Sequence, residues 1–333
     1  MMKKKFFALF LTIMVLLLSL CGCSSAYTEP EDNTPEILCA AFPEYDWTRN
    51  ILGDNPSDLR LQLLNDSGMD MHSYQPSVAD MVDIADAELV IFTGGDSEFW
   101  IEDALISSQS SGDSRRSISL MEVFSHNHEL ADLYTADEHE ENDHDHHHGE
   151  EEHAHATDEH LWLSLKLVPS FIREIAQAIA ELDPAHADYY EANASEYIAR
   201  IAALDILYEE TISSAGCSSL LFADRYPFKY LLEDYGLDYV AAFPGCSAET
   251  EASFETILKL SDTVNSLELQ AVIVLKKSDT ALAQTIINNS DNRDAEILIL
   301  DSMQSVTSKD IDDGATWLSI MESNLQTLAV ALD

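Results

Sequence analysis

The sequence predicts an α/β fold with two lobes, each a mostly parallel four-stranded sheet flanked by helices, joined by a long connector helix. Apolar strand patterns alternate with helical patterns on short connections in the first 120 residues and again after residue 218, which is typical of parallel sheets covered on both faces. Between these regions, residues 162–213 have a helical pattern and no strand pattern. The chain has 333 residues, enough for two domains of ordinary size.

Local signals set the bounds of the predicted elements in the first lobe. Pro43 ends the first strand, Gly53 stops the helix that follows, and Ser77 suits the N-cap of the next helix. An uninterrupted apolar run before Gly94 predicts a strand that is buried on both faces. The predicted strands cover residues 36–42, 59–64, 88–93 and 117–120, and the predicted helices cover residues 45–52, 77–85 and 99–107.

The connector and the second lobe follow the same reasoning. Asp183 and Pro184 interrupt the helical pattern, so we expect one helix over residues 162–181 and a longer one over residues 185–213. The lobes are placed at residues 36–165 and 215–333, with the connector at 166–214 between them. Predicted strands of the second lobe cover residues 219–223, 237–242, 271–275 and 296–300, and predicted helices cover 228–235, 253–266, 280–288 and 317–332.

The N-terminus resembles a bacterial lipoprotein signal. Basic residues open the chain, residues 6–20 are apolar but too few for an ordinary spanning helix, and Cys23 follows the small residue Gly22. We therefore expect a signal peptide at residues 1–22, lipidation of Cys23, and a flexible tether at residues 23–35. The alternative is a plain signal peptide that is cut nearby.

Histidine and carboxylate dominate residues 137–160. These 24 residues hold eight of the twelve histidines of the chain and eleven carboxylates. Imidazole and carboxylate are common ligands of zinc, and this composition cannot pack a core, so we expect a disordered loop at residues 126–158 that collects divalent cations. A solvated acidic linker is the alternative. His160 differs, because an apolar run follows it at once and can hold it still.

The charge and the cysteines restrict the class of protein further. The chain has 17 Lys and Arg residues against 61 Asp and Glu residues, a formal net charge of −44. Such a field repels phosphate backbones, so we expect no nucleic-acid partner. Once Cys23 carries lipid, Cys39, Cys217 and Cys246 remain, and an odd number does not describe a disulfide framework. Cys217 and Cys246 either pair or stay as thiols.

Four local motifs occur in order along the chain. They are Phe42-Pro43-Glu44-Tyr45-Asp46, Met71-His72-Ser73-Tyr74-Gln75-Pro76, the histidine-rich insertion just before Glu159-His160-Leu161-Trp162-Leu163, and Asp301 directly after the last strand. Together, and behind the lipoprotein signal, they resemble the metal-binding lipoproteins of bacterial ABC importers for zinc and manganese. The second motif is similar to the His-x-Tyr/Phe-x-Pro loop of that family. The resemblance covers residues 37–332.

The resemblance implies a metal site in the cleft between the lobes, with two ligands from each lobe. His72 and His160 would come from the first lobe and Asp301 from the second. The fourth ligand of the family, a His in zinc importers and usually a Glu in manganese importers, is matched here to Ala223, which has no ligating atom.

Several groups are alternatives for the fourth ligand. Asp224 is the weaker protein candidate, and Arg225 can instead hold Asp224 in an ion pair. Cys246, Glu249, a water molecule or a histidine of the tract are the others. The tract itself is expected to be an auxiliary metal loop of low affinity, with His139, His144, His146, His147, His148, His153 and His155 as its ligands.

The resemblance also implies a function, which is capture of a divalent transition metal outside the membrane and delivery to an ABC permease and its ATPase. We expect Zn²⁺, because the affinity order of divalent metals and the histidine tract favour it, with Mn²⁺ as the alternative. The protein is expected to be a lipid-anchored monomer on the extracytoplasmic face of a bacterial cell membrane, and not an enzyme. A metal-buffering surface adhesin is a rival, and a zinc hydrolase is less favoured because no His-Glu-x-x-His motif is present.

Overall fold

The computed structural model describes residues 34–108, 116–135, 158–243 and 252–333. Residues 35–333 form one compact unit. None of the helices in these ranges is long and apolar enough to cross a membrane.

The first lobe contains a parallel sheet in the order β2-β1-β3-β4. Its central strands are apolar and buried, as expected for a sheet with helices on both faces. Several of its loops leave the carboxyl ends of the strands, where ligands bind in such sheets. The elements are β1 (Glu36–Cys39), α2 (Phe42–Leu52), β2 (Arg60–Leu63), α3 (Val78–Asp86), β3 (Leu89–Phe92), α4 (Phe99–Ser108), β4 (Arg116–Ser119), α5 (Leu120–His126) and α6 (His128–Thr135).

The second lobe repeats this topology with a parallel sheet in the order β6-β5-β7-β8. In both sheets the first strand of the lobe is central and lies between the second and the third, so the loops after corresponding strands occupy corresponding places. The elements are β5 (Ser219–Phe222), α9 (Lys229–Asp234), β6 (Asp238–Ala241), α10 (Phe254–Ser266), β7 (Ala271–Leu275), α11 (Ala281–Asn289), β8 (Glu296–Leu300), α12 (Ser308–Asp312) and α13 (Trp317–Ala331).

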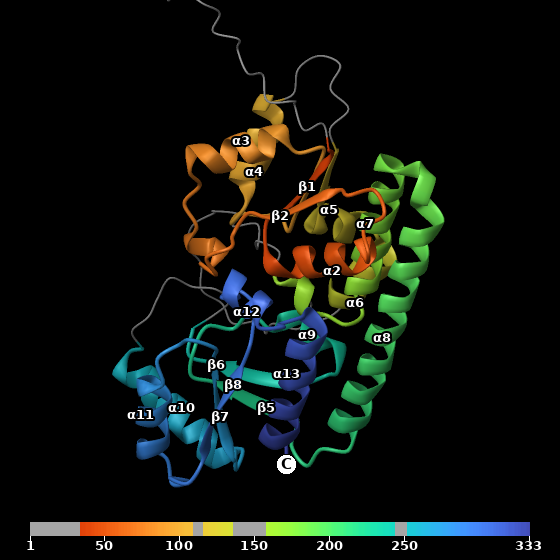
Figure 1. Cartoon of the computed structure of the whole chain (residues 1–333). Helices are drawn as coiled ribbons and strands as arrows, with labels where there is room; N and C mark the ends of the chain where they lie inside the picture. The colour runs from red at the N-terminus through yellow and green to blue at the C-terminus, as the bar shows by residue number, and fades with distance from the viewer. Residues whose placement is uncertain (1–33, 109–115, 136–157, 244–251) are drawn as a thin grey trace, which may run out of the picture. The chain divides into compact units, whose positions relative to one another are not determined.

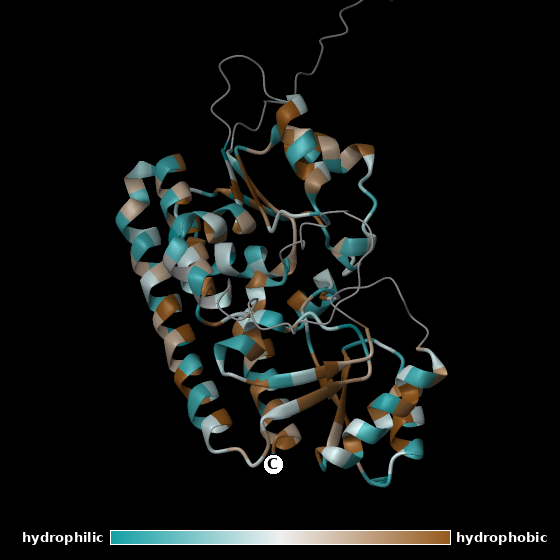
Figure 2. Ribbon diagram, turned by 180° about the vertical axis from the view of Figure 1, so that it is seen from behind, coloured by the Kyte–Doolittle hydropathy of each residue, from teal (hydrophilic) through white to brown (hydrophobic). Residues whose placement is uncertain are grey.

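Two helices connect the lobes, α7 (Val168–Leu182) and α8 (Ala187–Ser213). The 27 residues of α8 span about 40 Å at the helical rise, and the helix contacts α2 in the first lobe and α13 in the second. Its apolar residues recur at helical spacing and alternate with polar ones, which Figure 2 shows as brown and teal bands. Tyr197 donates a hydrogen bond to Asp46 in the first lobe, and Tyr208 donates one to the Met321 carbonyl in the second.

One apolar core runs through both lobes and the connector. Trp47 of α2 packs on Phe171 of α7 and on Trp317 of α13, with ring centroids 6.2 Å apart in both pairs. The Trp317 indole donates to the Trp162 carbonyl, and the Trp162 indole donates to the Ser302 carbonyl, each at 2.9 Å. The lobes are therefore joined by buried aromatic packing as well as by α8.

The predicted fold class is confirmed, and the local differences have physical explanations. The helix expected over residues 162–181 starts later than predicted. A short 3₁₀ turn, η2 (Leu161–Leu163), comes first, and α7 begins at Val168. Pro169 is next to this start, and proline suits the first turn of a helix. The segment 126–158, which we expected to be a disordered loop, begins with the helix α6 instead. The rest of that segment, residues 136–157, lies outside the described residues, as do Cys23 and the signal peptide.

Candidate metal centre

His72 lies in the short 3₁₀ turn η1 (Met71–Ser73) between β2 and α3. Asp70 is the N-cap of this turn, and its carboxylate accepts a hydrogen bond from the His72 backbone N–H at 3.1 Å. The Nδ1 atom of the ring is 2.5 Å from the Ser97 hydroxyl oxygen. Ser97 in turn donates to Glu159, so this chain orients the His72 ring with Nε2 on the side away from Ser97.

His160 precedes η2 and is buried, with 2% of its surface exposed. Its Nδ1 atom is 2.8 Å from the Asp158 carboxylate, which also accepts a hydrogen bond from the His160 backbone N–H. Burial raises the pKa of Asp158, but the hydrogen bonds from His160 outweigh it and hold that pKa below its ordinary value. An ionised Asp158 places the ring proton on Nδ1 and leaves the Nε2 lone pair for a metal.

The structure brings the two imidazoles together. Their Nε2 atoms are 3.3 Å apart, and their ring planes are inclined by 49°. Two nitrogen ligands at zinc–nitrogen distances of about 2.05 Å, separated by the tetrahedral angle, would lie about 3.3 Å apart. The pair therefore already has the spacing of two ligands on one tetrahedral zinc ion, with both Nδ1 atoms hydrogen-bonded on the opposite sides of the rings.

Two buried carboxylates lie behind this half of the site. Burial raises the pKa of Glu44 to about 7, and burial together with the neighbouring Glu44 raises that of Glu98 well above its ordinary value. Glu44 accepts a hydrogen bond from Thr93 through one oxygen, while its buried Oε2 atom has no hydrogen-bond partner among the described residues. Gly95 has a φ of +83°, and a Cβ atom there would meet the Glu159 carboxylate at 2.5 Å, so a side chain at that position would be strained.

The second lobe holds its carboxylates differently. Asp301 follows β8, and 9% of its surface is exposed. One oxygen accepts from Lys276 at 2.7 Å and the other accepts from the Met303 backbone N–H at 2.8 Å. The Asp301 backbone is held by Asn324, which donates to its carbonyl and accepts from its N–H.

Asp224 caps the second sheet, with one oxygen accepting from the Arg225 backbone N–H and the other from the Leu275 backbone N–H. We considered an ion pair between Arg225 and Asp224, but the guanidinium of Arg225 pairs with Asp70 of the first lobe at 2.7 Å. Both residues follow the end of β5 at Phe222, and in this loop Asp224 turns back onto the sheet while Arg225 reaches the first lobe. Ala223 is buried and contributes no polar side chain.

The complete predicted ligand set is not assembled. Among residues 34–108, 116–135, 158–243 and 252–333, no group of three or more His, Cys, Asp or Glu side chains lies close enough to hold a metal ion. The histidine pair is thus the part of the predicted site that the structure brings together, and the role of Asp301 stays a prediction. Cys246, Glu249 and the histidines of the tract lie outside the described residues.

Sequence reasoning did not find the residues that orient the histidines. Asp158 and Glu159 directly precede His160, so their position was a usable signal. Ser97 had no signal, because its contacts with His72 and Glu159 cross 25 and 62 residues.

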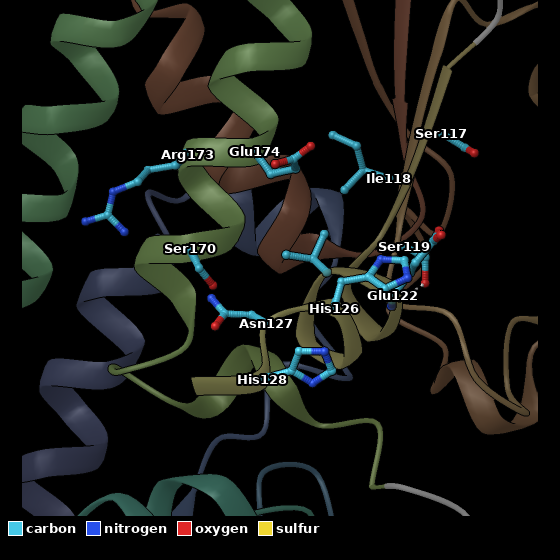
Figure 3. Close-up of a pocket in the computed structure, with 11 residues that line it drawn as sticks. Ser117, Ile118, Ser119, Glu122, His126, Asn127, His128, Ser170, Arg173 and Glu174 are labelled. Carbon is cyan, nitrogen blue, oxygen red and sulfur yellow. Dashed lines mark hydrogen bonds between the residues drawn. The ribbon is translucent and has the colours of Figure 1, made fainter. Parts of the chain in front are cut away.

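A separate cavity of about 810 Å³ lies on the first lobe, away from the histidine pair. Figure 3 shows the side chain of Asn127, between α5 and α6, pointing toward Ser170 of α7, and His126 and His128 flank Asn127 along the chain. These side chains form no metal-binding group of three in the described part of the chain. The histidine pair remains the candidate centre.

Comparison with known proteins shows the family of this chain. The family model described as zinc-uptake complex component A, periplasmic, matches residues 37–331. The zinc-binding lipoprotein AdcA of Streptococcus pneumoniae is 28% identical over 326 residues, which cover 96% of this chain and only 61% of AdcA. The high-affinity zinc uptake system protein ZnuA of Bacillus subtilis is 28% identical over 339 residues, 99% of each chain.

Solved structures show the same fold. The Zn(II)-bound ZnuA-like domain of AdcA from Streptococcus pneumoniae superposes with a TM-score of 0.68 at 24% identity, covering 90% of this chain and 99% of that domain. The lobed α/β architecture with its connecting helix is thus common to both.

Proposed function

Because the chain belongs to the family of the zinc-uptake complex component A, we propose that it captures Zn²⁺ outside the cytoplasmic membrane and delivers it to an ABC permease driven by its ATPase. The family is that of a binding component of uptake systems and not that of an enzyme. Relatives that carry zinc in their names, AdcA and ZnuA, support zinc as the metal.

The observation that carries the proposal is the histidine pair. Two imidazole nitrogens 3.3 Å apart, each ring oriented through Nδ1, have the spacing of two ligands of a tetrahedral zinc site. Such preorganisation supports tight binding, because the protein loses little side-chain freedom when the ion binds. Nitrogen ligands also favour Zn²⁺ over Mn²⁺ in the affinity order of divalent metals.

We assign the remaining coordination to the second lobe. Asp301 is the principal candidate, and it would exchange its ion pair with Lys276 for the metal. Asp224 is weaker, because both of its oxygens already accept backbone hydrogen bonds. A water molecule completes a four-coordinate site if only three protein ligands bind.

The N-terminal part and the tract complete the proposal. Lipidation at Cys23 would hold a monomer at the outer face of the membrane, where the histidine tract binds zinc weakly and raises its concentration near the tight site. These assignments rest on the sequence alone.

A metal titration tests the function. The soluble form that begins at Ser24 is titrated with Zn²⁺ and with Mn²⁺ by calorimetry, with and without residues 137–157. We expect one tight zinc site that survives the deletion, several weak sites that disappear with it, and weaker binding of Mn²⁺. Tight binding that His160→Ala leaves unchanged would exclude the assigned centre, and preference for Mn²⁺ would exclude zinc as the cargo.

A further inference from the structure

Asp70 joins the turn that carries His72 to the second lobe. Its Oδ1 atom accepts from the His72 backbone N–H at 3.1 Å and from the Gln304 side chain at 3.2 Å. Its Oδ2 atom accepts from the Arg225 guanidinium at 2.7 Å. Arg225 follows β5 and Gln304 follows β8, so two of these three donors belong to the other lobe. We call Asp70, Arg225 and Gln304 the Asp70 bridge.

The loop before Asp70 also rests on the second lobe. The backbone N–H and the hydroxyl of Ser308 both donate to the Asp66 carbonyl, at 2.9 and 3.2 Å. Gly68 has a φ of +66°, and a Cβ atom there would meet the Ser305 carbonyl oxygen at 2.7 Å. The segment that positions His72 is thus in close contact with the loop between β8 and α12.

The loop that carries His160 is anchored more deeply. Trp162, two residues further on, is 7% exposed and belongs to the core that runs through both lobes. By contrast, the side chains of Asp70 and Arg225 are 17% and 28% exposed. Contacts of the bridge can therefore break without disturbing apolar packing, whereas moving His160 requires the core to open.

From this geometry we propose that Asp70 is a positioning residue that couples the orientation of His72 to the second lobe through Arg225. While the second-lobe loops stay in place, Asp70 is held by three donors and fixes the η1 turn. When those loops move away, as on docking to a permease, the Asp70 side chain keeps only its bond to the His72 N–H, the η1 turn loses its support from the second lobe, and the metal is held less tightly. The inference rests on the proposed function, because it takes His72 as a ligand.

The direction in which zinc affinity changes when Arg225 is replaced distinguishes this role from simple charge repulsion. A positive charge near a metal site repels the cation, so removal of the Arg225 charge alone would tighten zinc binding. The bridge requires the opposite result, because His72 then loses part of its support. Loss of a partner that orients a metal ligand weakens binding about 10- to 100-fold.

The experiment measures zinc affinity and dissociation rate by chelator competition in Arg225→Met, Arg225→Lys, Asp70→Asn and the double variant Asp70→Asn/Arg225→Met. We expect Arg225→Met to bind zinc about 10-fold more weakly, with faster dissociation, and Arg225→Lys to recover most of that loss. Asparagine keeps an acceptor for the His72 N–H, so the double variant should be no weaker than Asp70→Asn alone. Lys309→Met is the control, because it makes the same charge change at an exposed pair with Asp313.

Several results would overturn the bridge. Unchanged or tighter binding in Arg225→Met, no recovery in Arg225→Lys, or additive losses in the double variant would each do so. Thermal unfolding of the metal-free variants shows whether they fold. If Arg225→Met does not fold, Gln304→Met tests the bridge instead, because it removes the other second-lobe donor to Asp70. His72→Ala separates the two proposals. Tight zinc binding in that variant refutes His72 as a ligand. If His72→Ala weakens zinc binding but Arg225→Met leaves it unchanged, only the proposed role of the bridge is refuted.

Discussion

The two lobes hold their candidate ligands in opposite ways. In the first lobe, Asp158 and Ser97 bind the Nδ1 atoms of the two histidines, and the two Nε2 atoms face each other at 3.3 Å. In the second lobe, the Asp301 carboxylate is already paired with Lys276 and a backbone N–H. If Asp301 is a ligand, as proposed, it must exchange a protein cation for the metal, whereas the histidines need no such exchange. We therefore expect the histidines to set the affinity and the second lobe to adjust it.

Removal of a first-lobe ligand should have the largest effect. His160→Ala deletes one of two nitrogen ligands, so zinc affinity should fall by more than the roughly 10- to 100-fold that loss of a ligand's orienting partner costs. Chelator competition on the soluble form measures the loss. His186→Ala is the matched control, because His186 lies between α7 and α8 and binds Asp183. Equal zinc affinities in the two variants would contradict the role of His160 as a ligand.

Loss of an orienting group in the first lobe comes next. Asp158→Asn removes the charge that holds the proton on Nδ1 of His160, so zinc affinity should fall about 10-fold while the ligand itself remains. A shallower loss of affinity below pH 7 should accompany it, because the charge of Asp158 also favours the protonated imidazole, which cannot bind a metal. Zinc titrations between pH 6 and 8 measure both, and identical pH profiles in the variant and the unaltered protein would contradict the prediction.

The buried acids of the first lobe predict a pH effect on stability. The pKa of Glu44 rises from 4.5 to about 7 on folding, chiefly through burial. Between these values the unfolded chain releases a proton that the folded chain keeps, so the free energy of unfolding falls as the pH rises from about 4.5 to about 7. Glu44→Gln should remove this dependence and add on the order of 1–3 kcal/mol at pH 8, with little change at pH 4.

Denaturant unfolding of the metal-free protein at pH 4 and pH 8 checks this. The high net negative charge also makes the folded protein more stable at lower pH, because protonation reduces the repulsion. Glu44→Gln is therefore compared with Glu102→Gln, which changes an exposed acid of α4. Equal gains in the two variants at pH 8 would assign the effect to net charge instead of burial.

The smallest expected effect is in the second lobe. Lys276→Met frees the Asp301 carboxylate from its ion pair, so zinc should bind about two- to fivefold more tightly, which is the range for a partly exposed pair. Lys277→Met is the control, because Lys277 is the neighbouring lysine and pairs with Asp310 instead. Weaker zinc binding in Lys276→Met would show that the lysine supports Asp301 as a ligand and does not compete for it.

Much of the fold followed from local patterns. All eight strands were predicted within a few residues, because apolar runs bounded by Gly and Pro reflect the local needs of a buried parallel sheet. The α6 helix was missed, since its sequence is polar and leads into the acidic tract. Candidate ligands were found only where a motif or an adjacent tract marked them, as for His72 and His160.

By itself the sequence determined the alternation of strands and helices, the family and the residue types of the candidate centre, because these depend on neighbours along the chain. Tertiary structure alone decided which groups meet: the two Nε2 atoms at 3.3 Å, the Lys276–Asp301 pair, and the contact of Arg225 with Asp70 across 155 residues. The physical reason is that such contacts depend on how two separately patterned sheets pack through a common core. Local propensity carries no record of that packing.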